Sequence, residues 1–222
     1  MNKLSTKTRI NILFDFDGVI CESLNEKTNA FYNLYLPFGE EIAQKVVKHH
    51  IDNMGVSRFD KIKYCHRTFL NIELEQQEVQ DLASKFSSLV LQNVINAPLV
   101  PGLIFFLEKY NSFFDYRIVT ATPNEEIIKV VNEKKLNNYF SSLHGSPESK
   151  GEWIKYLVRN GLISSKDCFF IGDAISDYNA AAENDVKFIL RRTDSNSSIN
   201  TLPKVLLSFG DYFELDQKIA EL

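Results

Sequence analysis

The sequence has few cysteines and no excess of basic charge. Cys21, Cys65 and Cys168 lie far apart and form no CxxC pair, so neither a disulfide framework nor a zinc site is indicated. With 25 Lys and Arg against 29 Asp and Glu, the formal net charge is −4. Broad electrostatic binding to nucleic acid or to an anionic membrane is therefore not expected. A small anionic ligand remains compatible, since it needs only a local cationic pocket.

Long hydrophobic runs are also missing. No apolar stretch approaches membrane-spanning length, and Met1–Arg9 is polar, without the apolar segment of a signal peptide. We therefore expect a cytoplasmic protein with no membrane partner. The 222 residues, 44% hydrophobic and 24% charged, suffice for one large domain, or for a core with a modest insertion, around a sizeable apolar interior.

The most informative segment joins an apolar run to two carboxylates. Ile10–Phe14 is followed directly by Asp15, Phe16, Asp17 and Gly18, a pattern that predicts a buried strand ending in an acidic loop. Open α/β sheets bind ligands at the carboxyl ends of their strands. There, one carboxylate can coordinate Mg²⁺ and attack an electrophile while the other handles protons.

Strand and helix signals alternate along most of the chain and predict a doubly wound, Rossmann-like α/β fold with a parallel sheet. The expected strands are Ile10–Phe14, Tyr116–Val119, Cys168–Ile171 and Lys187–Leu190. The expected helices are Gly102–Tyr110, Asn124–Lys135, Gly151–Asn160 and Asp177–Asn184. Arg191–Asn200 is expected to be a surface loop before a last strand or helix unit that ends at Leu222.

The interval from Glu22 to Ala97 breaks this alternation. It contains no convincing strand, and we interpret it as a helical insertion after the first strand, with a return hinge at Asn96–Gly102, which holds two prolines and a glycine. The expected domains are a core of residues 1–21 and 98–222 and a helical cap of residues 22–97. The expected cap helices are Thr28–Leu36, Glu41–His50, Phe59–Leu70 and Leu74–Ile95.

Because parallel strands bring their ends to one edge of the sheet, the residues that follow each strand are considered together. The first loop holds Asp15 and Asp17. The second, Thr120-Ala121-Thr122, follows a predicted strand. It offers a hydroxyl group and free backbone N–H groups at a helix start, which can hold phosphate oxygens.

The third and fourth loops add a cation and two further acids. Lys150 precedes a predicted helix and can offset the negative charge of a carboxylate nucleophile and of a phosphoryl group. Asp173 and Asp177 follow the strand Cys168–Ile171 and can complete an oxygen-rich metal shell. Together the four loops predict a phosphoryl-transfer site.

This set of motifs, in this order, resembles the haloacid dehalogenase superfamily, and in particular its phosphatase-like members with a helical cap after the first strand. The resemblance covers nearly the entire chain. It implies that Asp15 attacks phosphorus to form an aspartyl-phosphate, and that Asp17 protonates the leaving oxygen and then activates water. Dehalogenases of this superfamily lack the second aspartate and do not depend on Mg²⁺, so carbon–halogen hydrolysis is disfavoured.

The same resemblance assigns the remaining site residues. Thr120 and Ala121 would bind the phosphoryl group, and Lys150 would organise charge as a catalytic and substrate-binding residue. Mg²⁺ would be the cofactor, and the implied metal-site residues are Asp15, Asp17, Asp173 and Asp177.

A second resemblance lies in the insertion. Gly55-Val56-Ser57-Arg58 is similar to the substrate-specificity loop of the β-phosphoglucomutases, which implies that Arg58, with nearby lysines, meets a distal anionic group of the substrate. Ser23 stands where those mutases have a threonine, and Lys27 where they have a histidine that gates acid–base chemistry. These two departures disfavour a mutase.

Each candidate also has a structural interpretation. An aspartate after a strand often caps a turn or helix, and this alternative is strongest for Asp177. Thr120 can be an ordinary helix-start hydroxyl, and Lys150 and Arg58 can be solvated charges. His49-His50 has no companion at zinc-ligand spacing, which favours a surface or packing role.

The sequence thus predicts a Mg²⁺-dependent phosphohydrolase that acts on a small phosphorylated metabolite through an aspartyl-phosphate. Two alternatives stay open: a phosphomutase of the β-phosphoglucomutase type, and a non-catalytic protein that binds phosphorylated metabolites. No nucleic-acid partner is expected. The substrate is not fixed, because sugar phosphates, phosphoglycolate-like acids and nucleotides all suit a capped site.

Overall fold

A single parallel sheet of six strands forms the centre of the protein. The computed structural model describes residues 9–219; the polar amino-terminal segment up to residue 8 and the predicted end at Leu222 lie outside the described residues. The strand order is β3-β2-β1-β4-β5-β6, so the chain winds outward from β1 in both directions, and the predicted doubly wound fold is confirmed. The strands are β1 (Ile10–Phe14), β2 (Phe114–Pro123), β3 (Phe140–Ser146), β4 (Cys168–Gly172), β5 (Lys187–Arg191) and β6 (Val205–Phe209).

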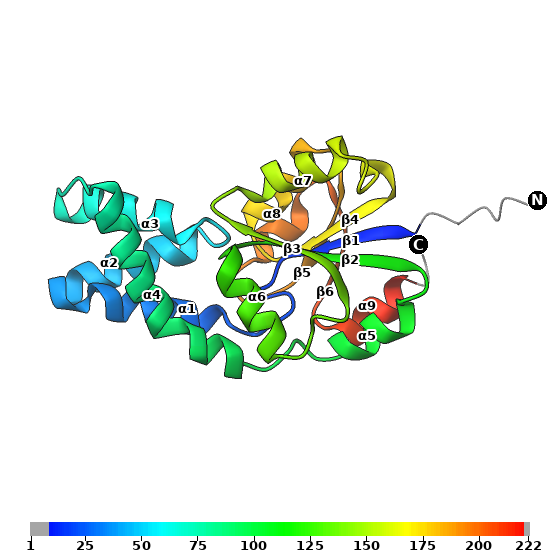
Figure 1. Ribbon diagram of the computed structural model, residues 1–222, viewed down its shortest axis with the longest axis horizontal. Helices are drawn as coiled ribbons and strands as arrows, with labels where there is room; N and C mark the ends of the chain where they lie inside the picture. The colour runs from blue at the N-terminus through cyan, green and yellow to red at the C-terminus, as the bar shows by residue number, and fades with distance from the viewer. Residues whose placement is uncertain (1–8, 220–222) are drawn as a thin grey trace, which may run out of the picture.

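Helices cover both faces of the sheet (Figure 1). Side chains of a strand alternate between its two faces, and β1 shows this directly: Ile12 and Phe14 belong to one buried cluster and Leu13 to the other. The first cluster includes α5 (Leu103–Tyr110), α6 (Asn124–Glu133) and α9 (Tyr212–Ile219). The second includes α7 (Lys150–Arg159) and α8 (Ile175–Glu183).

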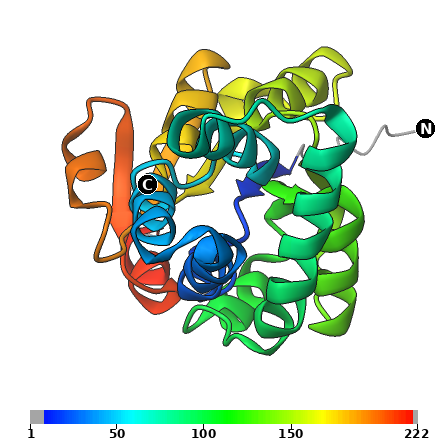
Figure 2. The same cartoon turned by 90° about the vertical axis from the view of Figure 1, so that its left-hand side faces the viewer.

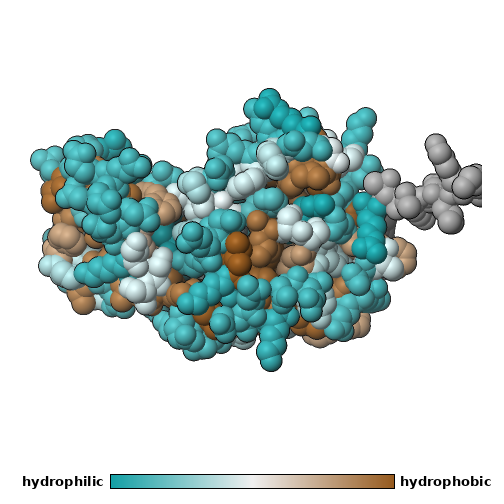
Figure 3. All heavy atoms as spheres, in the orientation of Figure 1, coloured by the Kyte–Doolittle hydropathy of each residue, from teal (hydrophilic) through white to brown (hydrophobic). Residues whose placement is uncertain are grey.

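Four further helices form a separate lobe, which we call the cap; the rest is the core. They are α1 (Leu24–Tyr35), α2 (Glu40–Asp52), α3 (Arg58–Cys65) and α4 (Gln76–Asn96). The cap lies beyond the carboxyl ends of the strands, as Figures 1 and 2 show, and the two lobes are visible in the space-filling view of Figure 3. All four helices fall within the predicted cap range of 22–97.

The cap holds together through its own apolar seam. The long helix α4 buries Val79, Ala83, Phe86, Val90 and Val94, which recur at the three- and four-residue spacing of one helix face. Aromatic contact adds to this seam, because the Phe31 ring of α1 lies 4.4 Å from the Phe86 ring between centroids. The cap is therefore a packed unit rather than a loop.

The two connections between core and cap run side by side. The Glu22 N–H donates to Pro98 O over 2.9 Å, and the Val100 N–H donates to Ile20 O over 3.0 Å. Cys21 and Leu99 pair between them as an antiparallel bridge. The cap thus leaves and rejoins the core through a short two-stranded ribbon. Among the helices of residues 9–219, none has the length and apolarity needed to cross a membrane.

The sequence interpretation was wrong about the sheet edge. It contained no strand at Phe140–Ser146, where β3 pairs in parallel with β2. Apolar and polar residues alternate only weakly in this segment, which contains Ser, His and Gly. Such residues are tolerated because an edge strand is only partly buried. The β2 strand is also longer than Tyr116–Val119 and reaches Pro123. The three other predicted strands and the four predicted helices of the core lie within a few residues of their expected places.

Short helical turns complete the described chain. Leu36–Phe38, Ser165–Asp167 and Ser197–Thr201 are 3₁₀ turns, and His66–Leu70 is a π turn that follows α3. The turn at Ser197–Thr201 overlaps the polar segment Arg191–Asn200, which the sequence predicts to be a surface loop.

Candidate active site

The ends of β1, β4 and the start of α7 bring a carboxylate and a lysine together. Asp15 follows β1, and its backbone N–H donates to Ile171 O of β4 over 2.9 Å. Lys150, the first residue of α7, places its Nζ 2.9 Å from Asp15 Oδ2 and also pairs with Asp177. Burial favours the neutral amine, but the two carboxylates outweigh it and raise the pKa of Lys150. The lysine therefore stays charged beside Asp15.

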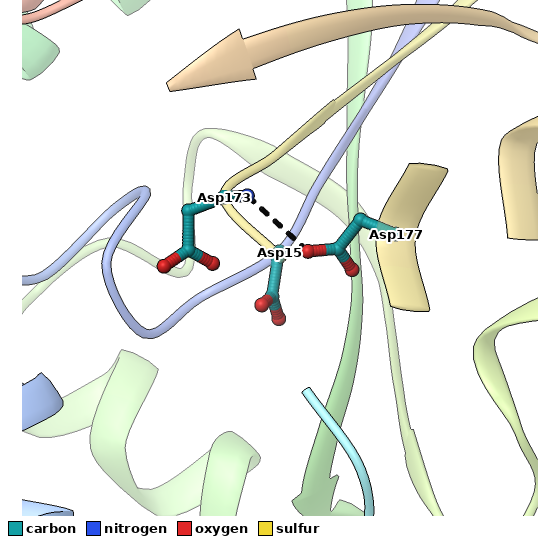
Figure 4. A group of neighbouring side chains, drawn as sticks. All are labelled: Asp15, Asp173 and Asp177. Carbon is teal, nitrogen blue, oxygen red and sulfur yellow. Dashed lines mark hydrogen bonds between the residues drawn. The ribbon is translucent and has the colours of Figure 1, made fainter. Parts of the chain in front are cut away.

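Three buried carboxylates form an acidic cluster, drawn in Figure 4. One oxygen from each of Asp15, Asp173 and Asp177 lies within 4.8 Å of the others. Asp177 Oδ1 accepts from Lys150, and its Oδ2 accepts from the backbone N–H groups of Asp173 (3.2 Å) and Ala174 (3.0 Å). By contrast, Asp15 Oδ1 and Asp173 Oδ2 are buried and have no hydrogen-bond partner.

Electrostatics show that this cluster is short of positive charge. Burial, together with the charges of Asp177 and Asp15, raises the pKa of Asp173 well above its ordinary value. Burial likewise raises the pKa of Asp177 to about 6, although Lys150 opposes the rise. Unpartnered carboxylate oxygens that face one another are suited to a hard divalent cation, which prefers oxygen ligands. The residues present therefore fit Mg²⁺.

Gly18 makes this arrangement possible. Its φ of +77° is a conformation that side chains disfavour, and a Cβ atom here would lie 2.5 Å from Asp173 Oδ2. The turn after Asp17 therefore has to be glycine for the Asp173 carboxylate to keep its position.

Asp17 points to the cap side of the site. Its carboxylate accepts hydrogen bonds from Ser23 Oγ (2.6 Å) and Thr122 Oγ1 (3.1 Å), and it pairs with Lys27 of α1. Lys27 also donates to Thr122 Oγ1 over 2.8 Å. Burial alone would raise the pKa of Asp17, but Lys27 and the two hydroxyl donors outweigh it, and the pKa is lowered. Unlike Asp15 and Asp173, Asp17 is outside the acidic cluster.

Thr120 and Ala121 lie at the end of β2. They belong to the strand itself rather than to the predicted loop, which is a correction. Between Val119 and Pro123 the pairing with β3 becomes irregular, so these residues leave the regular ladder. The Thr120 hydroxyl accepts from the Thr122 N–H over 3.3 Å, which leaves its own proton free to donate.

A cavity of about 50 Å³ lies between the two lobes. Its core wall is polar and consists of Asp15, Asp17, Thr120, Ala121, Lys150 and Asp173. Its cap wall consists of Leu24, Lys27, Phe31, His50, Met54, Gly55, Val56, Arg58 and Phe86. The structure thus brings every predicted site residue except Asp177 to one cavity, and Asp177 lies against Lys150 next to it.

Arg58 is engaged with the core. It begins α3, and its guanidinium donates to both carboxylate oxygens of Glu126 on α6, each over 2.8 Å. Ahead of it, Gly55 has a φ of +77°, and a Cβ there would lie 2.0 Å from Ser176 Oγ of α8, so the loop before α3 packs closely on the core. The contact of Arg58 with a distal anionic group stays a prediction.

Sequence reasoning missed three residues of this region. Lys27 was noted only as a departure from the mutases, and Glu126 was not singled out. His50 was expected at the surface or in packing; it is buried, which agrees with packing, and it also lines the cavity, which was not expected. Its Nδ1 accepts from Lys61 Nζ over 2.9 Å, and burial, followed by the charge of Lys61, lowers the pKa of His50 to about 2. These contacts depend on how the helices pack, which no local sequence motif predicts.

The parallel sheet, the inserted helical cap and the acidic cluster at the strand ends define a capped α/β protein with the layout of a hydrolase. A family model of haloacid dehalogenase-like hydrolases matches residues 12–191. The chain belongs to this family, as the sequence motifs indicated. None of the curated proteins compared with the chain matches it.

Solved structures share the fold over nearly the whole chain. β-Phosphoglucomutase from Clostridium difficile has a TM-score of 0.78 at 18% identity, covering 96% of both chains. A predicted phosphatase from Clostridium acetobutylicum has a TM-score of 0.74 at 18% identity, covering 96% of this chain and 99% of that one. A predicted phosphoglycolate phosphatase from Haemophilus somnus has a TM-score of 0.72 at 18% identity, covering 95% and 98%. At this identity the likeness establishes the fold alone.

Proposed function

We propose that this protein is a Mg²⁺-dependent phosphohydrolase that acts on a small phosphomonoester through an aspartyl-phosphate on Asp15. The observation that carries the proposal is the state of the Asp15 carboxylate. One oxygen is held by Lys150, the other is buried without a partner, and the residue lines the same cavity as Asp17 and Thr120. A carboxylate so placed is available as a nucleophile.

The three carboxylates of the acidic cluster have different roles in metal binding. Asp15 Oδ1 and Asp173 Oδ2 have no hydrogen-bond partner and would bind Mg²⁺ directly, which leaves Asp15 Oδ2, the oxygen that Lys150 holds, to attack phosphorus. Both oxygens of Asp177 already accept hydrogen bonds, so Asp177 is assigned a supporting role. When bound, Mg²⁺ would neutralise charge on the carboxylates and on the transferring phosphoryl group. The side chain of Asp17 is engaged elsewhere and is assigned to proton transfer.

In the first step, an Asp15 oxygen forms a bond to phosphorus while the bond between phosphorus and the ester oxygen breaks. The Asp17–Lys27 pair delivers a proton to the departing alcohol, and Lys150 and the Thr120 hydroxyl stabilise the phosphoryl oxygens. In the second step Asp17 removes a proton from water, the water oxygen attacks phosphorus, and phosphate leaves with Asp15 restored. The cap excludes bulk water during both steps.

The second candidate is a phosphomutase, which returns the phosphoryl group to a sugar. The fold likeness to β-phosphoglucomutase supports it. Against it stands Lys27, which occupies the position of the gating histidine and is bound to Asp17. Isomerisation of a sugar phosphate without net phosphate release would favour the mutase.

The test measures phosphate release from a panel of small phosphomonoesters with Mg²⁺ or EDTA. We expect Mg²⁺-dependent release that falls by at least ~10⁴-fold in Asp15→Asn, the range for loss of a nucleophile. Asp167→Asn, at an exposed aspartate ahead of β4, is the matched control and should retain full activity. Release by folded Asp15→Asn at the wild-type rate would refute the proposal. Tight Mg²⁺-dependent ligand binding without turnover would indicate a binding protein.

A further inference from the structure

Glu126 ties the cap to the core beside the cavity, because its partner Arg58 is one of the residues that line the cavity. It lies in the first turn of α6, and its carboxylate accepts from both terminal nitrogens of Arg58 and from Ser87 Oγ over 2.8 Å. The Arg58 and Glu126 side chains are only 4% and 8% exposed, and the guanidinium carbon lies 4.6 Å from the centroid of the Phe86 ring. This is a bidentate, buried ion pair with an additional hydroxyl donor.

The pair removes the free positive charge from the cap wall. Within residues 9–219, each cation that lines the cavity faces a carboxylate: Lys27 faces Asp17, Lys150 faces Asp15, and Arg58 faces Glu126. His50 is a neutral imidazole, because burial and Lys61 lower its pKa to about 2. The remaining cap side chains at the cavity are apolar: Leu24, Phe31, Met54, Val56 and Phe86.

The depression next to the cavity has the same character. It has a volume of about 320 Å³ and shares Gly55, Val56, Ala121 and Lys150 with the cavity. Its charged lining consists of Asp60, Glu148 and Glu183 in addition to Lys150. A substrate that extends in this direction therefore meets net negative charge.

We propose that Glu126 is a specificity-determining residue that restricts the enzyme to phosphomonoesters of small uncharged alcohols, an inference that rests on the proposed function. A second anionic group, such as a carboxylate or another phosphate, would enter a cavity whose lining cations, among the described residues, are all paired with carboxylates, since the unpaired Lys61 does not line it. It would have to displace Glu126 or remain buried without a counter-charge, and both are unfavourable. Discrimination therefore arises from a repulsive group as well as from fit.

The test compares two esters of similar size, 2-hydroxyethyl phosphate, which is neutral beyond its phosphate, and phosphoglycolate, which carries a carboxylate there. Wild-type kcat/KM should favour 2-hydroxyethyl phosphate by at least about tenfold. Glu126→Gln keeps the shape and frees the charge of Arg58, so the ratio should shift toward phosphoglycolate by about tenfold. Glu125→Gln, at the exposed neighbouring position, should leave the ratio unchanged.

A double variant shows whether the shift comes from Arg58. Arg58→Gln together with Glu126→Gln removes both charges, and the preference for 2-hydroxyethyl phosphate should return, with circular dichroism confirming the fold. An unchanged ratio in folded Glu126→Gln, or a wild type that prefers phosphoglycolate, would overturn the inference. No release from these two esters or from any ester of the panel would instead count against the proposed function, and thermal-shift titration with the two esters would then still measure the selectivity.

Discussion

The core and the cap each bury a lysine near the cavity, and they treat it in opposite ways. Lys150 of the core lies between Asp15 and Asp177, which raise its pKa. Lys61 of the cap donates to His50 and lies over the Phe31 ring, and in the described part of the chain it forms no ion pair. Burial, with the charge of Lys27, lowers the pKa of Lys61 to about 7.

This contrast separates chemistry from selectivity. The core keeps charged groups charged at the place where a phosphoryl group would be transferred. The cap either pairs its cations with a carboxylate, as Glu126 does with Arg58, or shifts them toward the uncharged form, as burial does at Lys61. The two walls of one cavity therefore contribute different properties: strong electrostatic stabilisation from the core, and a nearly neutral, apolar surface from the cap.

Among the substitutions that probe this contrast between the two lysines, the largest effect is expected from removing the core lysine. Lys150→Met leaves Asp15 and Asp177 without their buried counter-charge, so phosphate release should fall by about 10³-fold, as for loss of an oxyanion-stabilising donor. The free energy of unfolding should fall by about 3–5 kcal/mol, the cost of breaking a buried pair. Enzyme assays and urea unfolding measure the two effects. Lys155→Met, exposed on the same helix, serves as control and should change neither.

An intermediate effect is expected at the contact between the lobes. Lys27→Met removes the cation that holds Asp17 and Thr122, so kcat should fall by about 10- to 100-fold, at the low end of acid–base contributions. KM should change little, because Lys27 acts through Asp17 in the chemical steps. Lys27→Arg keeps the charge and should recover part of kcat. A rise in KM at constant kcat would show that Lys27 serves substrate binding instead.

The smallest effect, and one of opposite sign, is expected at the cap lysine. The unfolded chain keeps Lys61 protonated up to its ordinary pKa of 10.5, whereas the folded protein releases the proton near pH 7. Between these values the unfolded state binds more protons, so stability rises with pH: the site destabilises the fold fully at and below about pH 7, and this penalty is lost as the pH rises toward 10.5. Lys61→Met should raise Tm by several degrees at pH 7, and this gain should shrink toward pH 10.

Calorimetry at a series of pH values measures this difference. Lys63→Met, at an exposed position of α3, is the matched control, and its Tm should follow the wild type at every pH. A Tm difference between Lys61→Met and wild type that does not vary with pH would mean that Lys61 is neither perturbed nor costly to bury.

Much of the fold follows from local pattern. Ile10–Phe14 is apolar at every position except Asn11 because β1 is central and both its faces are covered, and the end of the strand was predictable from Asp15. The segment Phe140–Ser146 carries no such signal, because β3 pairs on one side only and tolerates polar residues. The long β2 was also underestimated, since its last residues leave the regular ladder and look like a turn in the sequence.

Some residues of the candidate site could likewise be predicted from the sequence and others could not. Asp15, Lys150 and Asp173 could be assembled from sequence because parallel strands deliver their ends to one edge. Glu126 could not, because its partner Arg58 is 68 positions away and the contact exists only when the cap is docked. The charge state of the cap wall is therefore a property of tertiary packing that no motif reports.

The two connecting segments between core and cap lie side by side, so the cap is an insertion with its two ends close together. The backbone groups of Glu22 and Pro98 are within hydrogen-bond distance, 2.9 Å, so the entire cap starts and finishes at almost the same point in space. To the core, those intervening residues are topologically one surface loop with closed ends, the situation in which insertions are tolerated best. A single short turn in their place would bridge the gap without moving any strand.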